Sequence, residues 1–362
     1  MTMHVAVSGW LLGPHSGANR RLLSLLAHMP TFLQAGERVT VLHRPDFVPP
    51  HLDGIGWQSI AIPAAPTWRR LLAERRLLPR ALRELGATVL DHGFLLAPDV
   101  PVPVCLLVHD LRAVDGHGRW PRWLARAALR RSLTRATLVV APSAWTASRL
   151  RALAPSATVA VVHNGVDVPA ATDASPPFPI PANGYVLHVG HLEARKNLTV
   201  VVDALRSLPA ATRPELWLAG RDAGALATLR ARAGDVVLRV LGVVPDAELG
   251  ALYHHARTVV VPSVHEGFGL PALEALAHGA RVLVSNQAAL PEVVGDAGTV
   301  LPAGDAAAWA HAIARTDDGI PPRGRRQRAS SFPWSAAASS LLDAWRRAHR
   351  SAARRSDPEA AG

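Results

Sequence analysis

Two carboxylates and a glycine-rich loop stand together in the second half of the chain. Residues 265–274 read His-Glu-Gly-Phe-Gly-Leu-Pro-Ala-Leu-Glu, which places Glu266 in the loop and Glu274 after it. Pro271 is well suited to the first turn of a helix, and the N–H groups at such a helix start suit a phosphate. Carboxylates do not suit an anion, so we expect Glu266 and Glu274 to accept hydrogen bonds from sugar hydroxyls.

The single lysine of the chain marks a second candidate site. The chain contains 39 Lys and Arg residues, and reading the sequence shows that only Lys196 is a lysine. Lys196 follows Arg195 in a segment that begins at Gly190, directly after an apolar run. A guanidinium offers a planar fork and an ammonium offers a point charge, and both suit the oxygens of a diphosphate.

Both candidate segments follow short apolar runs that are typical of buried parallel strands. Such runs alternate with helical patterns along the whole chain, which predicts parallel sheets wrapped by helices and ligands beyond the carboxyl ends of the strands. Strands are expected at residues 4–8, 38–42, 57–62, 87–90, 104–108, 137–141 and 158–162, and then at 185–189, 215–219, 236–240, 258–261, 281–284 and 299–301.

The length of 362 residues is enough for two domains of ordinary size. An Asn-Gly turn at 164–165 ends the first alternating region, and a stretch rich in Ala and Pro follows it. We therefore expect a first domain over 1–169, a linker over 170–182, a second domain over 183–333 and a terminal helix and tail over 334–362. The terminal helix is expected to end near Arg350.

Composition limits the class of protein further. With 49% hydrophobic residues the chain can bury a large core, yet no apolar run reaches the roughly 18 residues of a spanning helix. The N-terminus lacks the pattern of a signal peptide. The one cysteine, Cys105, excludes an internal disulfide and a cysteine metal cluster, so we expect a cytoplasmic setting.

The net charge of +11 is concentrated in the first half of the chain. Residues 1–170 hold 19 Arg against 10 acidic residues, whereas residues 171–330 hold 15 basic and 15 acidic residues. The basic excess indicates an anionic partner, such as a membrane surface, an acidic acceptor or nucleic acid. Segments 68–78 and 120–131 are basic, contain Trp and have a helical period. They either lie on an anionic membrane or present an exposed Arg face over buried Leu.

The pattern Gly190-x4-Arg195-Lys196-Asn197 followed by Glu266-x7-Glu274 resembles the retaining glycosyltransferases of family 4, in their mannosyltransferase-like branch. The resemblance covers most of the chain and is better in its second half. It implies an α/β protein with the GT-B fold, in which two Rossmann-like, doubly wound parallel-sheet domains face a cleft. It also implies that the first domain binds the acceptor, the second binds a nucleotide sugar, and the C-terminal helix crosses back to the first domain.

The resemblance also assigns roles to individual residues. It implies that His109 lies at the sugar-transfer site, that Arg195 and Lys196 contact the diphosphate, and that Glu266 contacts the donor sugar. The remaining donor-binding residues that it implies are Gly17 and Gly190 at the phosphates, Val243 at the base, Phe268, Gly269 and Leu270 in the loop, and Glu274 at the ribose hydroxyls.

Several of these positions also have a purely structural interpretation. Gly17 could belong to an ordinary strand-to-helix turn, Val243 to an ordinary loop, and His109 could be a structural histidine after its strand. Glu274 could simply complement the dipole of its helix. Ser143, which the family also has, is most simply a helix N-cap.

The expected reaction moves a hexose from a nucleoside diphosphate to a hydroxyl of a glycan or a lipid-linked acceptor, with retention. Our first choice of donor is GDP-mannose, and UDP-glucose or a UDP-N-acetylhexosamine stays open. No Asp-x-Asp motif is present, so we expect neither a metal nor another cofactor. The alternatives are a sugar-nucleotide epimerase and a basic membrane- or nucleic-acid-binding protein with a decayed site. We expect peripheral contact with the inner face of the membrane and no nucleic-acid partner.

Overall fold

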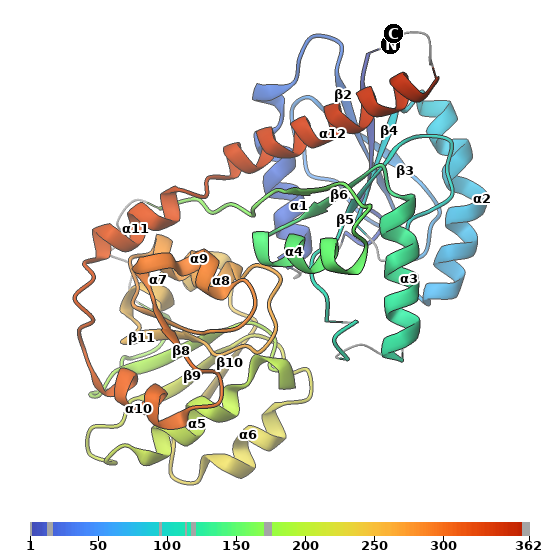
Figure 1. Cartoon of the computed structure of the whole chain (residues 1–362). Helices are drawn as coiled ribbons and strands as arrows, with labels where there is room; N and C mark the ends of the chain where they lie inside the picture. Colours follow the sequence, from blue (N-terminus) through green and yellow to red (C-terminus); the bar gives the residue numbers. More distant parts are fainter. Residues whose placement is uncertain are drawn as a thin grey trace. The chain divides into compact units, whose positions relative to one another are not determined.

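The computed structural model describes residues 2–12, 17–93, 96–112, 114–116, 121–169 and 176–356 (Figure 1). The chain divides into two compact units. Unit 1 comprises Met1–Gly165 and Trp334–Gly362, and unit 2 comprises Val166–Pro333. Of the expected linker, 170–175 lies outside the described residues, and the rest belongs to unit 2.

Unit 1 is built on a seven-stranded sheet in the order β3-β2-β1-β4-β5-β6-β7. Every neighbouring pair of these strands is parallel. The strands are β1 His4–Ser8, β2 Arg38–His43, β3 Ile55–Ser59, β4 Val89–His92, β5 Val104–Leu107, β6 Leu138–Ala141 and β7 Val159–Val161.

Helices cover the unit 1 sheet over two separate hydrophobic cores. The helices are α1 Gly17–His28, the short η1 Pro30–Phe32, α2 Thr67–Leu85, α3 Arg122–Arg135, α4 Ala144–Leu153 and α12 Trp334–Ser356. Leu106 and Val139 pack with apolar residues of α3 and α4. Ala6 and Leu90 pack instead with residues of α2. The sheet is therefore buried on both faces, as expected of parallel strands with crossover helices.

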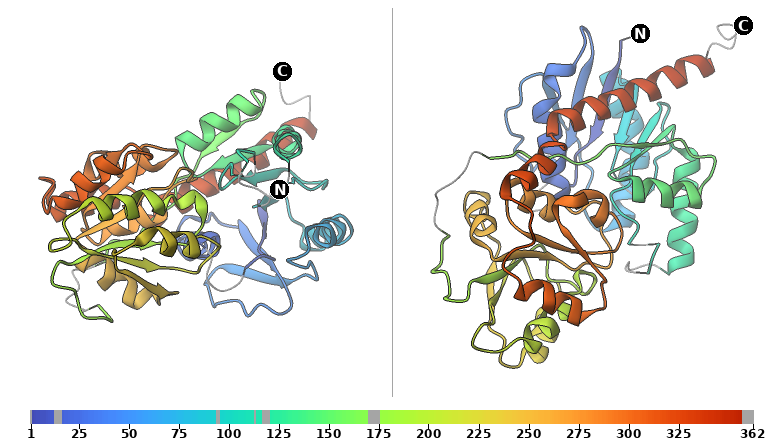
Figure 2. Two further views of the ribbon diagram at one scale, coloured as in Figure 1. Left: turned by 90° about the horizontal axis from the view of Figure 1, so that it is seen from below. Right: turned by 60° about the vertical axis from the view of Figure 1, so that its left-hand side comes forward.

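The terminal helix α12 joins unit 1 although its sequence follows unit 2 (Figure 2). Trp345 donates its indole N–H to Asp91 Oδ2 of β4 at 2.7 Å. Arg346 binds Glu37 through two hydrogen bonds of 2.9 and 2.7 Å and also donates to the Phe32 carbonyl. The predicted return of the chain to its first domain is thus made by specific buried contacts.

Unit 2 repeats the architecture with a six-stranded sheet in the order β10-β9-β8-β11-β12-β13, again parallel throughout. Its strands are β8 Tyr185–Val189, β9 Glu215–Ala219, β10 Leu238–Gly242, β11 Thr258–Val261, β12 Val282–Ser285 and β13 Thr299–Leu301. Its helices are η2 Ala194–Lys196, α5 Leu198–Ser207, α6 Leu226–Ala233, α7 Asp246–His255, α8 Leu270–Ala277, α9 Leu290–Val294, η3 Gly295–Ala297, α10 Ala306–Ala314 and α11 Pro322–Ser330.

Successive residues of β8 point to opposite faces of the unit 2 sheet, as the period of a strand requires. Tyr185 and Leu187 pack with α7, α8 and α9, whereas Val186 packs with α5, α6 and α10. Figure 1 shows these two groups of helices on the two sides of the sheet. Along the sheet the strand order runs one way from β8 to β10 and the other way from β11 to β13, which is a doubly wound topology.

The predicted strands all form, with shifts at a few ends. Strand β3 spans Ile55–Ser59 rather than 57–62, and β4 spans Val89–His92 rather than 87–90. The terminal helix was predicted to end near Arg350 but continues to Ser356, because no Gly or Pro stops it there. Within the described ranges, no helix combines the length and the apolar character that crossing a bilayer requires.

Candidate active site

The two candidate segments of unit 2 meet at the point where the order of its sheet reverses. Residues 190–197 follow β8 and residues 262–269 follow β11, and these two strands are paired. Ligands of open α/β sheets bind at such switch points, outside the carboxyl ends of the strands. The pairing of β8 with β11 therefore brings together residues that are distant in sequence. Lys196 and Glu266, for example, are 70 positions apart.

Lys196, Arg195 and Glu266 form one buried charged cluster. Lys196 Nζ lies 2.5 Å from Glu266 Oε1, and Arg195 Nη1 lies 3.5 Å from Glu266 Oε2. Arg195 also donates to the His265 carbonyl at 3.0 Å and pairs with Glu193 at 2.5 Å. The two cations assigned to a diphosphate and the carboxylate assigned to a sugar are therefore in direct contact.

Hydrogen bonds from neighbouring strands hold this cluster in place. Ser263 donates its hydroxyl to Glu266 Oε1 at 2.9 Å, and Ser285 donates to the Ser263 carbonyl at 2.5 Å. The backbone N–H of Val264 donates to the Arg195 carbonyl at 2.9 Å, which ties the two loops together. Ser263 and Ser285 are completely buried.

The charges of the cluster keep Glu266 ionised. Burial by itself raises the pKa of Glu266, but the positive charges of Lys196 and Arg195 outweigh it. With the hydrogen bonds from Lys196 and Ser263, they lower this pKa to about 2. Glu266 is thus a carboxylate over the whole physiological pH range and can only accept hydrogen bonds.

The start of α8 supplies backbone N–H groups beside the cluster. Gly269 is the N-cap, with a φ of 108° that favours glycine. A Cβ at this position would lie 2.7 Å from Leu290 Cδ2, so a larger residue would also force the end of the Leu290 side chain to move. The first N–H groups of a helix have no partner inside the helix, so Gly269 and Leu270 present donors to a ligand.

Glu274 is held by a tyrosine from the preceding helix. Tyr253 of α7 donates its hydroxyl to Glu274 Oε2 at 2.9 Å. With Pro271 in the first turn, the sequence predicts that Glu274 also lies in that turn. This prediction is wrong by one turn, because α8 begins at Leu270 and Glu274 is its fifth residue. At that depth the helix dipole acts weakly on a carboxylate, which leaves less weight for the purely structural interpretation.

The other predicted donor-binding residues of unit 2 follow the carboxyl ends of β8, β10 and β11. Gly190 follows β8 with a φ of 139°, and a Cβ there would lie 3.7 Å from Lys196 Nζ. Val243 follows β10 and is 51% exposed. Phe268 is buried against Phe332, with ring centroids 5.9 Å apart, so its side chain belongs to the core and its backbone to the loop.

His188, at the end of β8, is a residue that the sequence analysis missed. It is completely buried, and burial and then the charge of Lys196 lower its pKa to about 3, so the ring is neutral. Its Nδ1 lies 3.3 Å from the Val260 carbonyl and donates to it, which leaves Nε2 as an acceptor. A Cβ on Gly190 would lie 3.6 Å from this Nε2 and 3.7 Å from Lys196 Nζ, so His188 adjoins the lysine.

His109 and Gly17 belong to unit 1. His109 follows β5 and is partly buried, and burial and then the charges of Arg21 and Arg112 lower its pKa to about 3. Arg21, on α1, is itself buried and donates to Asn164 Oδ1 at 2.6 Å. Gly17 is the first residue of α1, and the loop 13–16 before it lies outside the described residues.

Ser143 acts as the predicted helix cap. Its side chain accepts a hydrogen bond from the backbone N–H of Thr146 at 3.1 Å at the start of α4. Within the described ranges, no three His, Cys, Asp or Glu residues are grouped as ligands for a metal ion. Within the loop 190–197 that follows β8, the basic side chains are His191, Arg195 and Lys196, of which Arg195 and Lys196 contact Glu266.

The doubly wound sheets of the two units, with α12 returned to unit 1, are those of the GT-B glycosyltransferase fold. The sucrose-phosphate synthase of Thermosynechococcus elongatus has a similar structure, with a TM-score of 0.76 over 96% of this chain and 100% of that chain, at 19% sequence identity. At this identity the likeness concerns the fold alone.

Family models match both halves of the chain. Residues 15–169 match the model of glycosyltransferase family 4, and residues 183–316 match that of the glycosyl transferases group 1. The chain therefore consists of two glycosyltransferase domains, of family 4 over 15–169 and of group 1 over 183–316.

Two curated relatives are mannosyltransferases by name. The O-antigen chain mannosyltransferase B of Escherichia coli is 38% identical over 181 residues, which cover 45% of this chain and 46% of that protein. The GDP-mannose-dependent alpha-(1-6)-phosphatidylinositol dimannoside mannosyltransferase of Mycobacterium tuberculosis is 33% identical over 168 residues, which cover 45% of this chain and 44% of that protein. The matched segments thus span about half the length of these relatives.

Proposed function

We propose that the protein is a retaining, metal-independent glycosyltransferase that moves a hexose, with mannose from GDP-mannose as first choice, to a hydroxyl of a glycan or lipid-linked acceptor. The observation that carries the proposal is the buried contact of Lys196 and Arg195 with Glu266 at the switch point of unit 2. A site made of two fixed cations, an ionised carboxylate and a helix start has the parts that a nucleoside-diphosphate sugar needs.

The chemical problem in this reaction is the negative charge that develops on the departing diphosphate. Donors fixed at the position of that charge stabilise the transition state without reorganisation. We assign this role to Arg195, Lys196 and the N–H groups of Gly269 and Leu270. The donor's diphosphate then takes over hydrogen bonds that the cations make to Glu266, and the freed carboxylate accepts from a hydroxyl of the sugar.

Glu274 completes the donor site as the acceptor for the ribose hydroxyls. Its carboxylate accepts a hydrogen bond from Tyr253, and a carboxylate can accept several hydrogen bonds at once. Retention of configuration rests on the family resemblance, in which the departing phosphate oxygen takes the acceptor's proton while the new bond forms on the same face. His109, neutral at physiological pH, is assigned to the sugar-transfer site with a hydrogen bond to the sugar.

The names of the two curated relatives favour mannose, and one of them names GDP-mannose. A UDP-sugar donor and a sugar-nucleotide epimerase remain the alternatives. A thermal-shift panel of GDP, UDP, GDP-mannose, UDP-glucose and UDP-N-acetylglucosamine separates the donors, because a ligand that binds the native state raises its melting temperature. We expect the largest shift with GDP-mannose, and a larger shift with the UDP compounds would overturn the choice of mannose donor.

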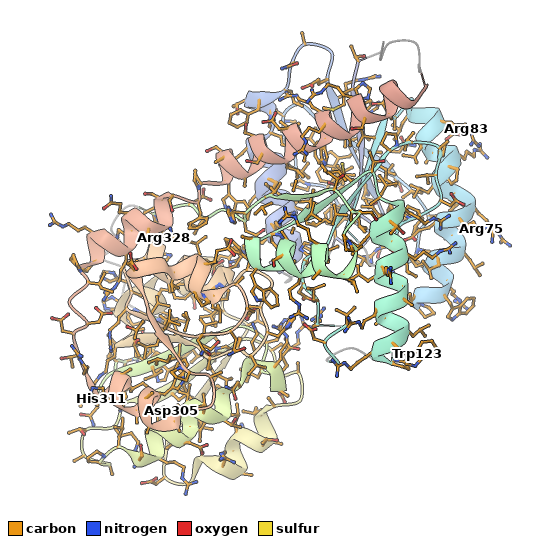
Figure 3. The ribbon with its side chains drawn as sticks, in the orientation of Figure 1. Arg75, Arg83, Trp123, Asp305, His311 and Arg328 are labelled. Atoms are coloured by element: carbon orange, nitrogen blue, oxygen red, sulfur yellow. The ribbon has the colours of Figure 1, made fainter. Side chains whose placement is uncertain are left out.

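We further propose that unit 1 contacts an anionic membrane surface through the apolar tips of two basic helices. Trp68 of α2 is 59% exposed and Trp123 of α3 is 71% exposed, while Leu78 and Leu129 of the same helices are buried. Figure 3 shows Arg75 and Arg83 pointing outward from α2 and Trp123 at the end of α3. The buried Leu face accounts for the helical period, but it leaves both exposed Trp rings unexplained.

A flotation assay tests the membrane contact. Vesicles with phosphatidylglycerol should carry the wild-type chain at low salt, and a Trp68→Ser/Trp123→Ser variant should bind at least about tenfold less, since burying one large apolar side chain contributes about 1.5–3 kcal/mol. Val48→Ser, which changes another exposed apolar residue of unit 1, is the control and should bind like wild type. Equal binding of all three proteins, or none at low salt, would refute the contact.

A further inference from the structure

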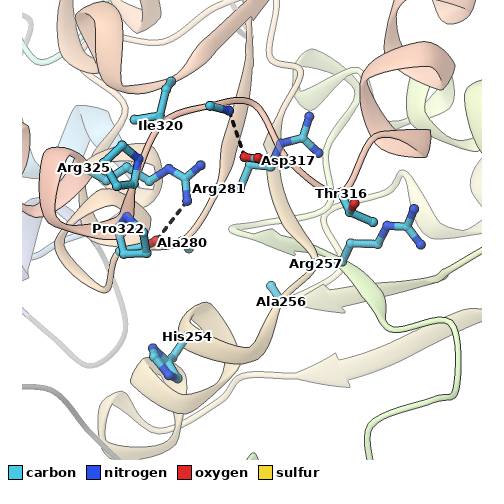
Figure 4. A pocket seen from close by; sticks show the side chains of 13 residues that line it. His254, Ala256, Arg257, Ala280, Arg281, Thr316, Asp317, Ile320, Pro322 and Arg325 are labelled. Atoms are coloured by element: carbon cyan, nitrogen blue, oxygen red, sulfur yellow. Dashed lines mark hydrogen bonds between the residues drawn. The ribbon is translucent and has the colours of Figure 1, made fainter.

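A cavity of about 550 Å³ lies in unit 2, away from the candidate active site. Its walls come from His254 and Arg257, just before β11, from Arg281, just before β12, and from residues 316–317 and 319–322 and Arg325 (Figure 4). Residues that precede parallel strands lie at the amino edge of the sheet, whereas Lys196 and Glu266 follow the carboxyl ends. The cavity is therefore a separate site on the opposite edge of the same sheet.

Positive charge dominates the walls of this cavity. Arg257, Arg281 and Arg325 line it together with a single carboxylate, that of Asp317. Asp318, behind the wall, is bound by Arg325 at 2.5 Å and lies 3.4 Å from Arg281. Three guanidinium groups thus stand against two carboxylates.

Backbone carbonyls also hold these arginines in position, while the one carboxylate of Asp318 is shared between Arg281 and Arg325. Arg281 donates to the carbonyls of Ala312 and Arg315, each at 2.8 Å, and Arg257 donates to that of Ala314 at 2.8 Å. Arg281 and Arg325 are only 5% and 7% exposed. Among the described residues, the Nε groups of Arg257 and Arg325 have no hydrogen-bond partner. A buried, incompletely paired guanidinium is costly unless an anion joins it.

The other wall residues differ in chemistry from the arginines. The Asp317 carboxylate accepts from the Gly319 N–H at 2.8 Å, and the Thr316 side chain is exposed beside it. Ile320 and Pro322 give the cavity an apolar side. The volume falls within the roughly 300–1,000 Å³ of small-molecule sites and exceeds what a bare phosphate ion fills.

We propose that this cavity binds a small phosphorylated sugar. The guanidinium groups receive the phosphate, Asp317 and Thr316 bind sugar hydroxyls, and Ile320 and Pro322 pack against the apolar face of the ring. The proposal is independent of the function of the Lys196–Glu266 site, because its residues lie at the other edge of the sheet.

Isothermal titration calorimetry of the full chain with glucose 6-phosphate tests this site. Wild type should bind one equivalent more tightly than it binds inorganic phosphate, and glucose should not bind. Thr316→Glu puts a carboxylate into the cavity without touching the buried arginines, and it should weaken binding at least tenfold. Thr228→Glu, an equally exposed threonine on α6, is the matched control and should bind like wild type.

Two further variants keep the test decisive. His254→Glu places the repelling charge on another exposed wall residue and replaces Thr316→Glu if that variant has a lower melting temperature. Lys196→Ala should bind glucose 6-phosphate like wild type, because that lysine lies at the other site. The proposal is overturned by no binding at millimolar ligand, by equal affinity for inorganic phosphate, by a loss in Lys196→Ala, or by equal weakening in Thr228→Glu.

Discussion

Lys196, the single lysine of the chain, makes one specific contact, which is its ion pair with Glu266. Its ammonium is almost fully buried and is matched by Glu266 at 2.5 Å, with Arg195 close to the same carboxylate. Burying an ion pair of this kind brings little net stability, because both charges lose their hydration. We therefore infer that the cluster serves ligand binding rather than stability, and that the Glu266 carboxylate positions the two cations in the absence of a diphosphate.

Lys196→Ala should lower turnover at least about a hundredfold, since one lost electrostatic donor removes about 2.7–4 kcal/mol of transition-state stabilisation. The variant leaves the buried Glu266 with Arg195, at 3.5 Å, as its cationic partner, so the protein should also lose stability, by up to about 3 kcal/mol. Steady-state kinetics and thermal melts measure the two effects.

A double variant separates these effects. Lys196→Ala/Glu266→Gln also removes the buried negative charge that has lost its lysine partner, and it should recover most of the melting temperature without recovering turnover. Arg206→Ala, at an exposed position of α5, should leave both quantities unchanged. Near-normal turnover in Lys196→Ala would remove the proposed role of the lysine.

The residues to which we assign the chemistry could be proposed from the sequence, but their supporting partners could not. Glu266 and Lys196 stand out in the sequence by spacing and by rarity. Neither spacing nor rarity distinguishes Tyr253, Ser285 and His188 in the sequence, because each makes its contact only in the folded sheet. Tyr253, for example, reaches Glu274 across 21 positions of the chain.

At the scale of elements, the order of the strands in the unit 2 sheet positions the two loops of the candidate site. Strands β8 and β11 are neighbours only because the sheet reverses its direction between them. The strands themselves were predictable from apolar runs. The predicted strand ended at residue 90, whereas β4 continues through Asp91 and His92. These two residues were not predicted because they are polar, although both are buried. Their partners, Trp345 and Ser8, are distant in sequence.

The contact between β4 and α12 should make stability depend on pH. Burial raises the pKa of Asp91 from 3.8 to about 6, although the Trp345 hydrogen bond and the charge of Arg21 oppose this. A native pKa above the unfolded value means that the native state binds the proton more tightly. Stability from this group is therefore present below pH 3.8 and lost as the pH rises through 6.

Comparison with Asp91→Asn isolates this effect. The difference in unfolding free energy between wild type and Asp91→Asn should shift in favour of wild type by up to about 3 kcal/mol as the pH falls from 7 to 4. Urea denaturation at several pH values measures it. A difference that stays constant with pH, or that moves the other way, would show that the native state does not raise the pKa of Asp91.

At the scale of the whole molecule, the two units share one topology but differ in charge. Residues 1–170 carry the basic excess, whereas residues 171–330 are balanced, with 15 basic and 15 acidic residues. A balanced unit with a local cationic cluster suits a diphosphate, and a basic unit suits an anionic surface or acceptor. The division into two sheets was predictable from the strand pattern. The identity of the acceptor was not, because loops rather than strands determine it.

The central claim is that protein cations, rather than a metal ion, stabilise the departing diphosphate. The most direct measurement is the rate of GDP release from GDP-mannose with a mannose-terminated oligosaccharide as acceptor, in the presence and absence of EDTA. We predict the same rate in both conditions, at least about a hundredfold loss in Lys196→Ala, and a product with the anomeric configuration of the donor. Abolition of wild-type activity by EDTA, with recovery on adding a divalent ion, would contradict the account.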